Sequence, residues 1–308
     1  MKNIVLIIAL LFSNIVLVYA QPTKMEVAPK KEGIENVPFD STRNWLGNEN
    51  VYSYRGQELY VLPNRASFIE LKNMSFTSMT STVASGYSYG ANSILPYAER
   101  DVVEDKIFVV DSVYKHMIET SKYVFVMHFK DNPENKCQFL YDTRFEFNFP
   151  FLVMSYYNYL VNKCTNKTIV CWNKIYDSDV ETGEKIVFDG EYMEWECYGV
   201  SIIEGVVLNL KNKLNGQKSY VSVEYLFPTS VRVRAFIKED WDALVKLYGI
   251  DVMTCVMNST IKIGMPVAAL KMSWGLPKTI NTPSFGDEQW VNKNDFVYVK
   301  DGKVTAWN

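Results

Sequence analysis

Histidine is the side chain that most often transfers protons or binds metals near neutral pH, and this chain has only two. His116 lies in a Tyr-Lys-His-Met stretch, and His128 lies in a strand-like Val-Met-His-Phe pattern. Neither has a second histidine four residues away or a neighbouring G-x-S-x-G turn, which zinc ligation and serine activation respectively require. We therefore interpret both as structural residues and expect no metal site.

Paired carboxylates could hydrolyse a glycoside without any histidine, one acting as acid and the other as base or nucleophile. Two acidic clusters offer such pairs. The first alternates like the exposed face of a strand and the second resembles a solvated loop, so both are typical of surface charge. We predict no catalytic residues and keep a carboxylate hydrolase as a third hypothesis. The first cluster is Glu191, Glu194 and Glu196 around Trp195, and the second is Asp101, Glu104 and Asp105.

The chain has five cysteines and no C-x-x-C pair, so neither a zinc site nor thioredoxin-like chemistry is indicated. Cys164 and Cys171 are close enough in sequence to close a tight loop. Spacing leaves the disulfide connectivity open, however, and free buried thiols are the alternative. Residues 86–90 lack the lysine and helix of a phosphate-binding loop, so we expect no cofactor. The cysteines are Cys137, Cys164, Cys171, Cys197 and Cys255.

Aromatic side chains are the other candidates for a function. Exposed tyrosine and tryptophan can stack on sugars or anchor a protein interface. Several tyrosines fall at expected loops or strand edges, and the alternative is that they pack small β cores while their hydroxyls reach water. The candidates are Tyr52, Tyr54, Tyr87, Tyr89, Tyr156, Tyr157 and Tyr159.

The start of the chain has the layout of a secretory signal peptide over residues 1–20. A short segment with Lys2 precedes an apolar run over residues 4–18, which is too short and too weakly flanked for a stop-transfer helix. We predict cleavage after Ala20; the alternative is a buried N-terminal helix. No cysteine follows the run, so we expect no lipoprotein anchor, and the protein is predicted to be periplasmic or secreted.

Composition is typical of a globular protein. Of the 308 residues, 48% are hydrophobic and 14% are aromatic, which is enough for packed cores and argues against disorder. The formal net charge of −3 offers no basic surface, so we expect no nucleic-acid partner. After the signal peptide we expect no membrane span, because the nearest apolar run, residues 149–157, is short and contains a proline.

Strand-like patterns dominate the chain up to about residue 236. Residues 21–45 are polar and rich in proline and lysine, and they predict an extended linker. The runs that follow are rich in β-branched and aromatic residues and are bounded by turn formers. We predict two small β modules, residues 46–150 and residues 151–237, as SH3-like barrels or sheets. The predicted strands include residues 58–62, 106–110, 123–129, 138–141, 168–172, 206–210, 220–225 and 231–236.

The second module resembles a repeat of the first. In each, a strand ending in a hydrophobic residue and tyrosine is followed, after a gap, by a hairpin with an Asp, Asn or Lys turn. The matched first strands are residues 106–114 and residues 167–176. Between the modules, residues 151–160 have a spacing that also suits a short helix. The match lies in pattern more than in identity.

The last part of the chain has a helical period and then returns to strands. Residues 240–248 place apolar side chains on one stripe, and Gly249 is positioned to end that helix. Helical turns over residues 251–258 and a helix over residues 266–274, closed by glycine, are expected next. The predicted strands are residues 278–282, 288–291, 296–300 and 303–307, the last two joined by an Asp301-Gly302 hairpin turn.

The order of motifs in this last part is informative. Gly-Met-Pro opens a helix, Gly-Leu-Pro-Lys follows it, and an aromatic strand leads to a final hairpin with Asp-Gly-Lys. Residues 255–308 thereby resemble the BamE/SmpA-like domain, whose fold is shared with β-lactamase inhibitor protein. Pro266 departs from the family, which usually has threonine or serine there. The resemblance implies protein binding or scaffolding of envelope complexes. The whole chain is also similar to secreted proteins of the Bacteroidota, a likeness that supplies no catalytic residues.

These patterns predict a mainly β protein with a C-terminal α+β domain over residues 238–308. Tandem small β modules would be followed by helices packed on an antiparallel sheet. We predict an exported, non-enzymatic protein that interacts with an envelope protein. A carbohydrate-binding protein that uses exposed tyrosine or tryptophan is the alternative, with a glycan as its partner.

Overall fold

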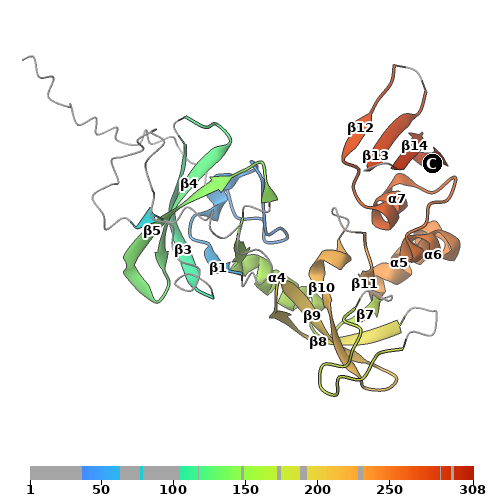
Figure 1. Ribbon diagram of the computed structural model, residues 1–308, viewed down its shortest axis with the longest axis horizontal. Coiled ribbons are helices and arrows are strands. Elements are labelled where there is room, and N and C mark those ends of the chain that lie inside the picture. Colours follow the sequence, from blue (N-terminus) through green and yellow to red (C-terminus); the bar gives the residue numbers. More distant parts are fainter. Residues whose placement is uncertain are drawn as a thin grey trace, which may run out of the picture. The chain divides into compact units, whose positions relative to one another are not determined.

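The described strands of this computed structural model form three antiparallel sheets, of six, five and four strands (Figure 1). Along the described chain, one α-helix lies between the first and second sheets, and three α-helices lie between the second and third sheets. The fold is therefore mainly β with an α+β region, as the sequence predicted. The predicted signal peptide lies outside the described residues, and the predicted domain boundaries stay predictions. The structure describes residues 37–62, 77–78, 105–116, 118–146, 149–171, 175–187, 193–227, 232–284, 286–292 and 295–308.

Six strands form the first sheet: β1 (Glu58–Val61), β2 (Thr77–Ser78), β3 (Ile107–Lys115), β4 (Lys122–Phe129), β5 (Asn132–Asp142) and β6 (Phe151–Val153). Their order across the sheet is β2-β5-β4-β3-β1-β6. β1 pairs with β3 on one side and with β6 on the other. β6 is buried at all three of its positions. This short strand follows the other five in the sequence and completes the sheet next to β1.

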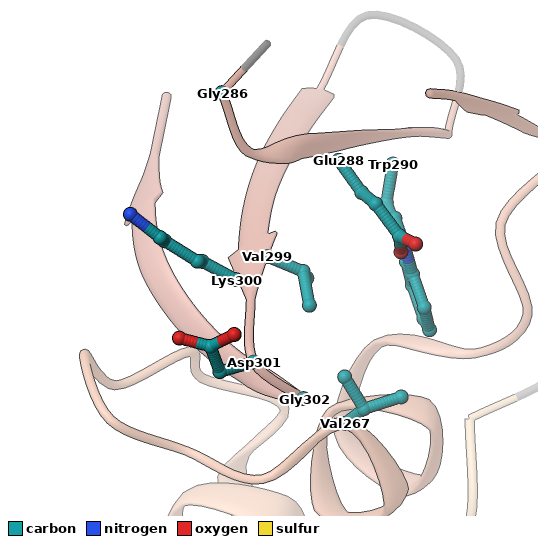
Figure 2. A pocket seen from close by; sticks show the side chains of 8 residues that line it. All are labelled: Val267, Gly286, Glu288, Trp290, Val299, Lys300, Asp301 and Gly302. Atoms are coloured by element: carbon teal, nitrogen blue, oxygen red, sulfur yellow. The ribbon is translucent and has the colours of Figure 1, made fainter. Parts of the chain in front are cut away.

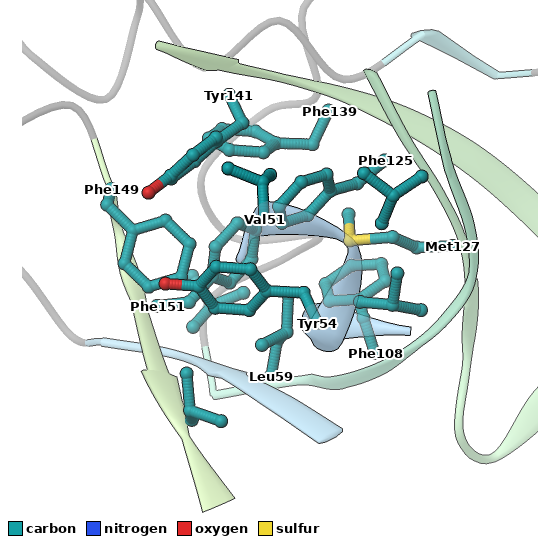
Figure 3. Close-up of a cluster of buried hydrophobic side chains, with 14 of the residues drawn as sticks. Val51, Tyr54, Leu59, Phe108, Phe125, Met127, Phe139, Tyr141, Phe149 and Phe151 are labelled. Atoms are coloured by element: carbon teal, nitrogen blue, oxygen red, sulfur yellow. The ribbon is translucent and has the colours of Figure 1, made fainter. Parts of the chain in front are cut away.

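An aromatic core lies against the first sheet (Figure 3). Tyr54, at the end of the 3-10 helix η1 (Val51–Tyr54), is fully buried, and its ring centroid lies 5.6 Å from that of Tyr141. Its hydroxyl accepts a hydrogen bond from the Leu46 amide at 3.0 Å and donates to the Asn44 carbonyl at 3.3 Å. A buried tyrosine usually satisfies its hydroxyl in this way. Tyr54 therefore joins the segment before η1 to the core.

Residues 37–45, which we predicted as the end of an extended linker, are attached to the first sheet. The Asn44 side chain donates to the Phe151 carbonyl and accepts from the Val153 amide, both at 2.8 Å. These are the backbone groups of β6 that a further strand would otherwise pair. The Asn44 amide thus takes the place of a strand partner at the sheet edge, and the linker boundary stays a prediction.

The second sheet consists of β7 (Thr168–Cys171), β8 (Met193–Ile202), β9 (Val206–Asn212), β10 (Lys218–Ser222) and β11 (Ala235–Ile237). Their order across the sheet is β10-β9-β8-β7-β11, with β11 buried throughout. Trp195, on β8, is fully buried in the core beneath this sheet.

The first two sheets share one layout. With the two-residue β2 left aside, the order of strands in each is fourth, third, second, first, fifth. Each fifth strand continues directly into a helix, β6 into α4 (Met154–Cys164) and β11 into α5 (Lys238–Tyr248). The helix expected near residues 151–160 is thus present as α4, preceded by β6. This layout is compatible with the SH3-like modules that the sequence predicts.

One strand of the predicted repeat alignment is wrong. The topology matches β3 with β8 and β1 with β7, whereas the sequence pattern matched the strand now seen as β3 with β7. The hairpins β4–β5 and β9–β10 do correspond, because each is antiparallel and lies at the same place in its sheet. The difference arises because the predicted strands do not include β8, although its Glu-Trp-Glu-Cys-Tyr-Gly sequence alternates like a strand face.

The third sheet is a meander of β12 (Thr279–Asn281), β13 (Glu288–Asn292), β14 (Asp295–Lys300) and β15 (Lys303–Trp307). It shares a core with α5, α6 (Ile250–Asn258) and α7 (Val267–Trp274). The predicted helix stops are correct, since Gly249 has φ 85° and Gly275 has φ 89°. Asp301 at φ 50° and Gly302 at φ 72° make the predicted hairpin turn.

The Tyr54 hydroxyl gives a first testable prediction. Tyr54→Phe retains the ring but leaves the buried Leu46 amide without its acceptor, so we expect the free energy of unfolding to fall by about 1–3 kcal/mol. Urea denaturation followed by circular dichroism measures it. The matched control is Tyr198→Phe on an exposed ring, which should change stability by less than about 0.5 kcal/mol. Equal stability of the two variants would contradict the structural role of the Tyr54 hydroxyl.

Candidate functional site

The two histidines lie in separate structural contacts. The His116 ring nitrogen Nδ1 accepts hydrogen bonds from the Glu119 amide at 3.0 Å and the Ile118 amide at 3.4 Å, which closes the turn after β3. His128 Nδ1 lies 2.8 Å from Asp111 Oδ1 on the neighbouring strand. Within the described segments, no group of three or more His, Cys, Asp or Glu side chains could hold a metal ion.

The described members of the first acidic cluster face lysines. Glu194 lies 4.0 Å from the Lys213 ammonium and 3.9 Å from that of Lys238. Glu196 stands opposite Lys211 in the β8–β9 register. Long, partly exposed ion pairs of this kind stabilise a protein little. They are typical of a solvated strand face rather than of an acid–base pair.

The second acidic cluster lies mostly outside the described residues. Asp105 is described, and it accepts a hydrogen bond from the Tyr60 hydroxyl. Asp101, Glu104 and also Glu191 of the first cluster fall outside the part of the chain that the structure describes.

All five cysteines are free thiols, and four of them are buried. The disulfide between Cys164 and Cys171 that the sequence allowed is not formed, and both lie in the core beneath the second sheet. Burial raises the pKa of Cys164 to about 11 and that of Cys137 to about 12. Thiols so rarely ionised are poor nucleophiles.

The tyrosines that we singled out from the sequence are not the exposed ones. Tyr54 is fully buried. The Tyr157 hydroxyl donates to the Val200 carbonyl at 2.8 Å, and burial raises the pKa of Tyr156 to about 12. Stacking on a ligand by these residues is therefore not supported. Tyr52 and Tyr159 are also only partly exposed, and Tyr87 and Tyr89 lie outside the described residues.

A different set of tyrosines gathers on the outer side of the second sheet. The register between β8 and β9 shifts so that Cys197 faces Leu210 and Gly199 faces Asn209, which leaves Tyr198 without a partner residue on β9. A β bulge of this kind adds one residue and can redirect its side chain. Tyr198 alternates with the buried Trp195 and Cys197, so it lies on the outer face of the sheet, and its side chain is 45% exposed.

A stacked pair of rings lies at the edge of the same sheet. Tyr176 and Tyr220 have ring centroids 4.8 Å apart and an interplanar angle of 11°. The Tyr176 amide donates to the Tyr220 carbonyl at 2.9 Å, so the Tyr176 segment runs along the free edge of β10. Tyr176 remains 44% exposed. We call the surface formed by Tyr176, Tyr198, Gly199, Asn209, Lys218 and Tyr220 the tyrosine face.

Asp179 holds the Tyr176 segment in place. Its Oδ1 accepts from the amides of Glu181 and Thr182, both at 2.8 Å, and its Oδ2 accepts from the Lys218 amide of β10 at 2.7 Å. These hydrogen bonds lower the pKa of Asp179 from its ordinary value. One carboxylate thus organises the turn and joins it to the sheet edge.

Lys218 lies beside the Tyr198 ring of the tyrosine face. Its ammonium lies 5.8 Å from the centroid of the Tyr198 ring and 2.6 Å from Glu181 Oε1. The hydrogen bond to Glu181 raises the pKa of Lys218. A cation at this distance from a tyrosine ring is attracted by the ring quadrupole and helps to orient it.

A second candidate site is an open pocket of about 460 Å³ in the third sheet (Figure 2). Glu288, Trp290 and Val299 point toward the Val267 end of α7, whereas Lys300 lies on the other side (Figure 2). Glu288 Oε2 accepts from the indole nitrogen of Trp290 at 3.1 Å. The pocket offers the carboxylates of Glu288 and Asp301 and the ammonium of Lys300 beside apolar side chains, which suits binding of a polar ligand.

The other residues that line the pocket are Gly286, which lies before β13, and Asp301 and Gly302. The turn between β14 and β15 therefore forms part of the pocket wall.

Comparison with known protein families, curated proteins and solved structures finds no match to this chain. The BamE-like resemblance of the last residues and the similarity to secreted Bacteroidota proteins therefore stay predictions. Across the described helices, none has the length and apolar character needed to cross a membrane.

The sequence did contain a signal for the tyrosine face. Gly199 directly follows Tyr198 inside a run that otherwise alternates between buried and exposed positions. An isolated glycine in a strand pattern indicates a bulge or a close approach. The pairing of Tyr176 with Tyr220 carries no comparable local signal, because it depends on the contact between a loop and a strand edge.

The hydrogen bonds of Asp179 give a second prediction. Asp179→Ala removes the acceptor for three amides, so we expect faster amide hydrogen exchange in residues 176–182, with exchange in β8 unchanged. Asp177→Ala, at an exposed neighbouring carboxylate, is the matched control and should leave exchange as in the parent.

The same contact has a defined pH dependence. Because the folded pKa of Asp179 is lowered, its contribution is present above the unfolded value of about 3.9 and is lost as pH falls through the folded pKa. Slow exchange in residues 176–182 of Asp179→Ala, equal to that of the parent, would contradict the role of this carboxylate.

Proposed function

We propose that this protein is an exported, non-enzymatic binding protein and that the tyrosine face is its recognition surface. The observation that carries the proposal is the outward position of Tyr198 at a β bulge, beside the stacked Tyr176–Tyr220 pair. Exposed tyrosines are effective anchors because they bury a large area at a small cost in side-chain entropy.

Export and an envelope role rest on the sequence. The signal-like residues 1–20 support a periplasmic or secreted location. The BamE-like pattern of residues 255–308 supports an interaction with an envelope protein. Both proposals concern the place where the tyrosine face would meet its ligand.

A second candidate surface is the pocket of the third sheet. Its Glu288 carboxylate beside Trp290 would suit a basic group of a protein partner. A carboxylate hydrolase has less support, because Glu194 is engaged by Lys213 and Lys238.

In-cell crosslinking tests the proposal. The tagged full chain is crosslinked in its own cells, and the captured material is compared between the parent and Tyr198→Ala. We expect a discrete ligand whose recovery falls about tenfold in the variant, because one aromatic anchor at the centre of an interface contributes roughly 1–2 kcal/mol. The control is Trp307→Ala on the third sheet, since Trp307 is also 45% exposed.

Equal recovery from Tyr198→Ala and the parent would contradict the tyrosine face as the recognition surface. If Glu288→Gln abolished recovery instead, the pocket of the third sheet would replace it. Capture of no discrete ligand by the parent protein would contradict a binding function.

A further inference from the structure

We propose that the tyrosine face binds a polysaccharide chain through pyranose rings of gluco configuration, that is, rings whose hydroxyls are all equatorial. The inference rests on the proposed function, because it names the ligand class of that same surface. Such a ring has a flat apolar face of C–H groups and a polar rim of hydroxyls. It therefore needs an aromatic ring to stack on and hydrogen-bonding groups beside it.

The aromatic requirement is met by Tyr198. Tyr198 alternates along β8 with the buried Trp195 and Cys197, so its side chain points outward, and the Lys218 ammonium near the ring restricts its position. Tyr198 is bounded on β8 by Gly199, so one side of the ring borders a position without a side chain. A sugar stacked on Tyr198 can therefore extend over Gly199.

The space above Gly199 is available for a ligand. A Cβ atom at this position would have only the Asn209 amide nitrogen near it, at 3.7 Å. Gly199 is not among the glycines with positive φ, so the backbone there does not require glycine. The absence of a side chain leaves the Asn209 amide uncovered.

The polar requirement is met at the floor of this space. Asn209 Oδ1 accepts a hydrogen bond from the Ser201 hydroxyl at 2.9 Å, which orients the amide so that its nitrogen faces the Gly199 position. An amide N–H held in this way can donate to a sugar hydroxyl, and the Ser201 oxygen can accept from one. Neutral donors and acceptors beside an aromatic ring suit a sugar better than an ion.

The charges of the tyrosine face also suit a neutral ligand. Lys218 is paired with Glu181 at 2.6 Å, and Glu196 stands opposite Lys211 in the strand register. Lys218 is thus paired with a carboxylate and Lys211 stands opposite one, which reduces the attraction of this surface for a phosphate or a nucleic acid. A neutral polysaccharide can bind this surface without removing an unpaired charge from water.

The extent of the surface indicates more than one sugar. Tyr198 lies on β8, and the Tyr176 segment lies beyond β9 and β10 at the sheet edge. Three strand spacings of about 4.8 Å place these aromatic groups roughly 14 Å apart across the strands. That distance exceeds a single pyranose ring, so a linear oligosaccharide could contact Tyr198 and the Tyr176–Tyr220 pair together.

Binding of defined oligosaccharides tests the inference. The mature full chain is titrated by isothermal calorimetry with cello-oligosaccharides and chito-oligosaccharides, and with manno-oligosaccharides, whose axial hydroxyl interrupts one ring face. We expect binding of the cello or chito series and at least tenfold weaker binding of the manno series.

Three variants locate the site. Tyr198→Ala should weaken binding about tenfold by removing the stacking ring, whereas Tyr198→Phe should retain most of it. Gly199→Val should abolish binding by filling the space, and it removes no hydrogen-bonding group. Valine favours strands, so its unfolding midpoint should match that of the parent and show that loss of binding is not loss of fold. Trp307→Ala is the matched control and should bind as the parent does.

Each contrary outcome separates the two proposals. Binding that is unchanged in Tyr198→Ala and Gly199→Val would overturn the site. No binding of either series, while in-cell capture of a protein still depends on Tyr198, would overturn the sugar ligand and leave the recognition surface standing. No sugar binding together with no Tyr198-dependent capture would overturn both.

Discussion

Pairing of one strand on both of its edges is the constraint on which the first two sheets depend. β1 must pair with β3 and β6, and β7 must pair with β8 and β11. β6 and β11 have only three residues each, and burial of every side chain compensates for so few hydrogen bonds. Both strands come from late in their sheets, so these contacts cost the most chain entropy to form. Without them the first strand of each sheet would be an unprotected edge.

This arrangement also determines which surface is left for binding. In the second sheet β7 and β11 take part in the cores shared with α5, while β8, β9 and β10 present their other side to solvent. The bulge at Tyr198 lies on that side. The free edge of β10 is covered by the Tyr176 segment, held by Asp179. A rigid sheet therefore positions aromatic and polar groups that neighbouring segments keep in fixed orientations.

Local patterns were enough to predict much of the fold. The helices α5, α6 and α7 followed from helical periodicity, the ends of α5 and α7 followed from Gly249 and Gly275, and the Asp301-Gly302 turn followed from turn chemistry. Most strands were predicted for the same reason, since alternation and β-branched residues are local signals. β8 is absent from the predicted strands, although the alternation of its acidic residues is itself a strand pattern.

The candidate site was less predictable, because exposure is decided by pairing that is distant in the sequence. Tyr54 lies beside turn formers and yet fills the first core, since η1 folds beneath the sheet. Tyr198 is exposed because it alternates along β8 with the buried Trp195 and Cys197, on the outer face of the sheet. Both residues are tyrosines. The outer position of Tyr198 on β8 and the packing of η1 beneath the first sheet are what make Tyr198 exposed and Tyr54 buried.

Hydroxyl-radical footprinting in intact cells tests the central claim most directly, because it detects an occupied surface whatever the ligand is. Labelling of each aromatic side chain is compared between the protein in its native location and the purified protein. We expect Tyr176 and Tyr198 to be protected in cells, while Trp307 is labelled equally in both. Equal labelling of Tyr198 in cells and in the purified protein would contradict the tyrosine face as a recognition surface.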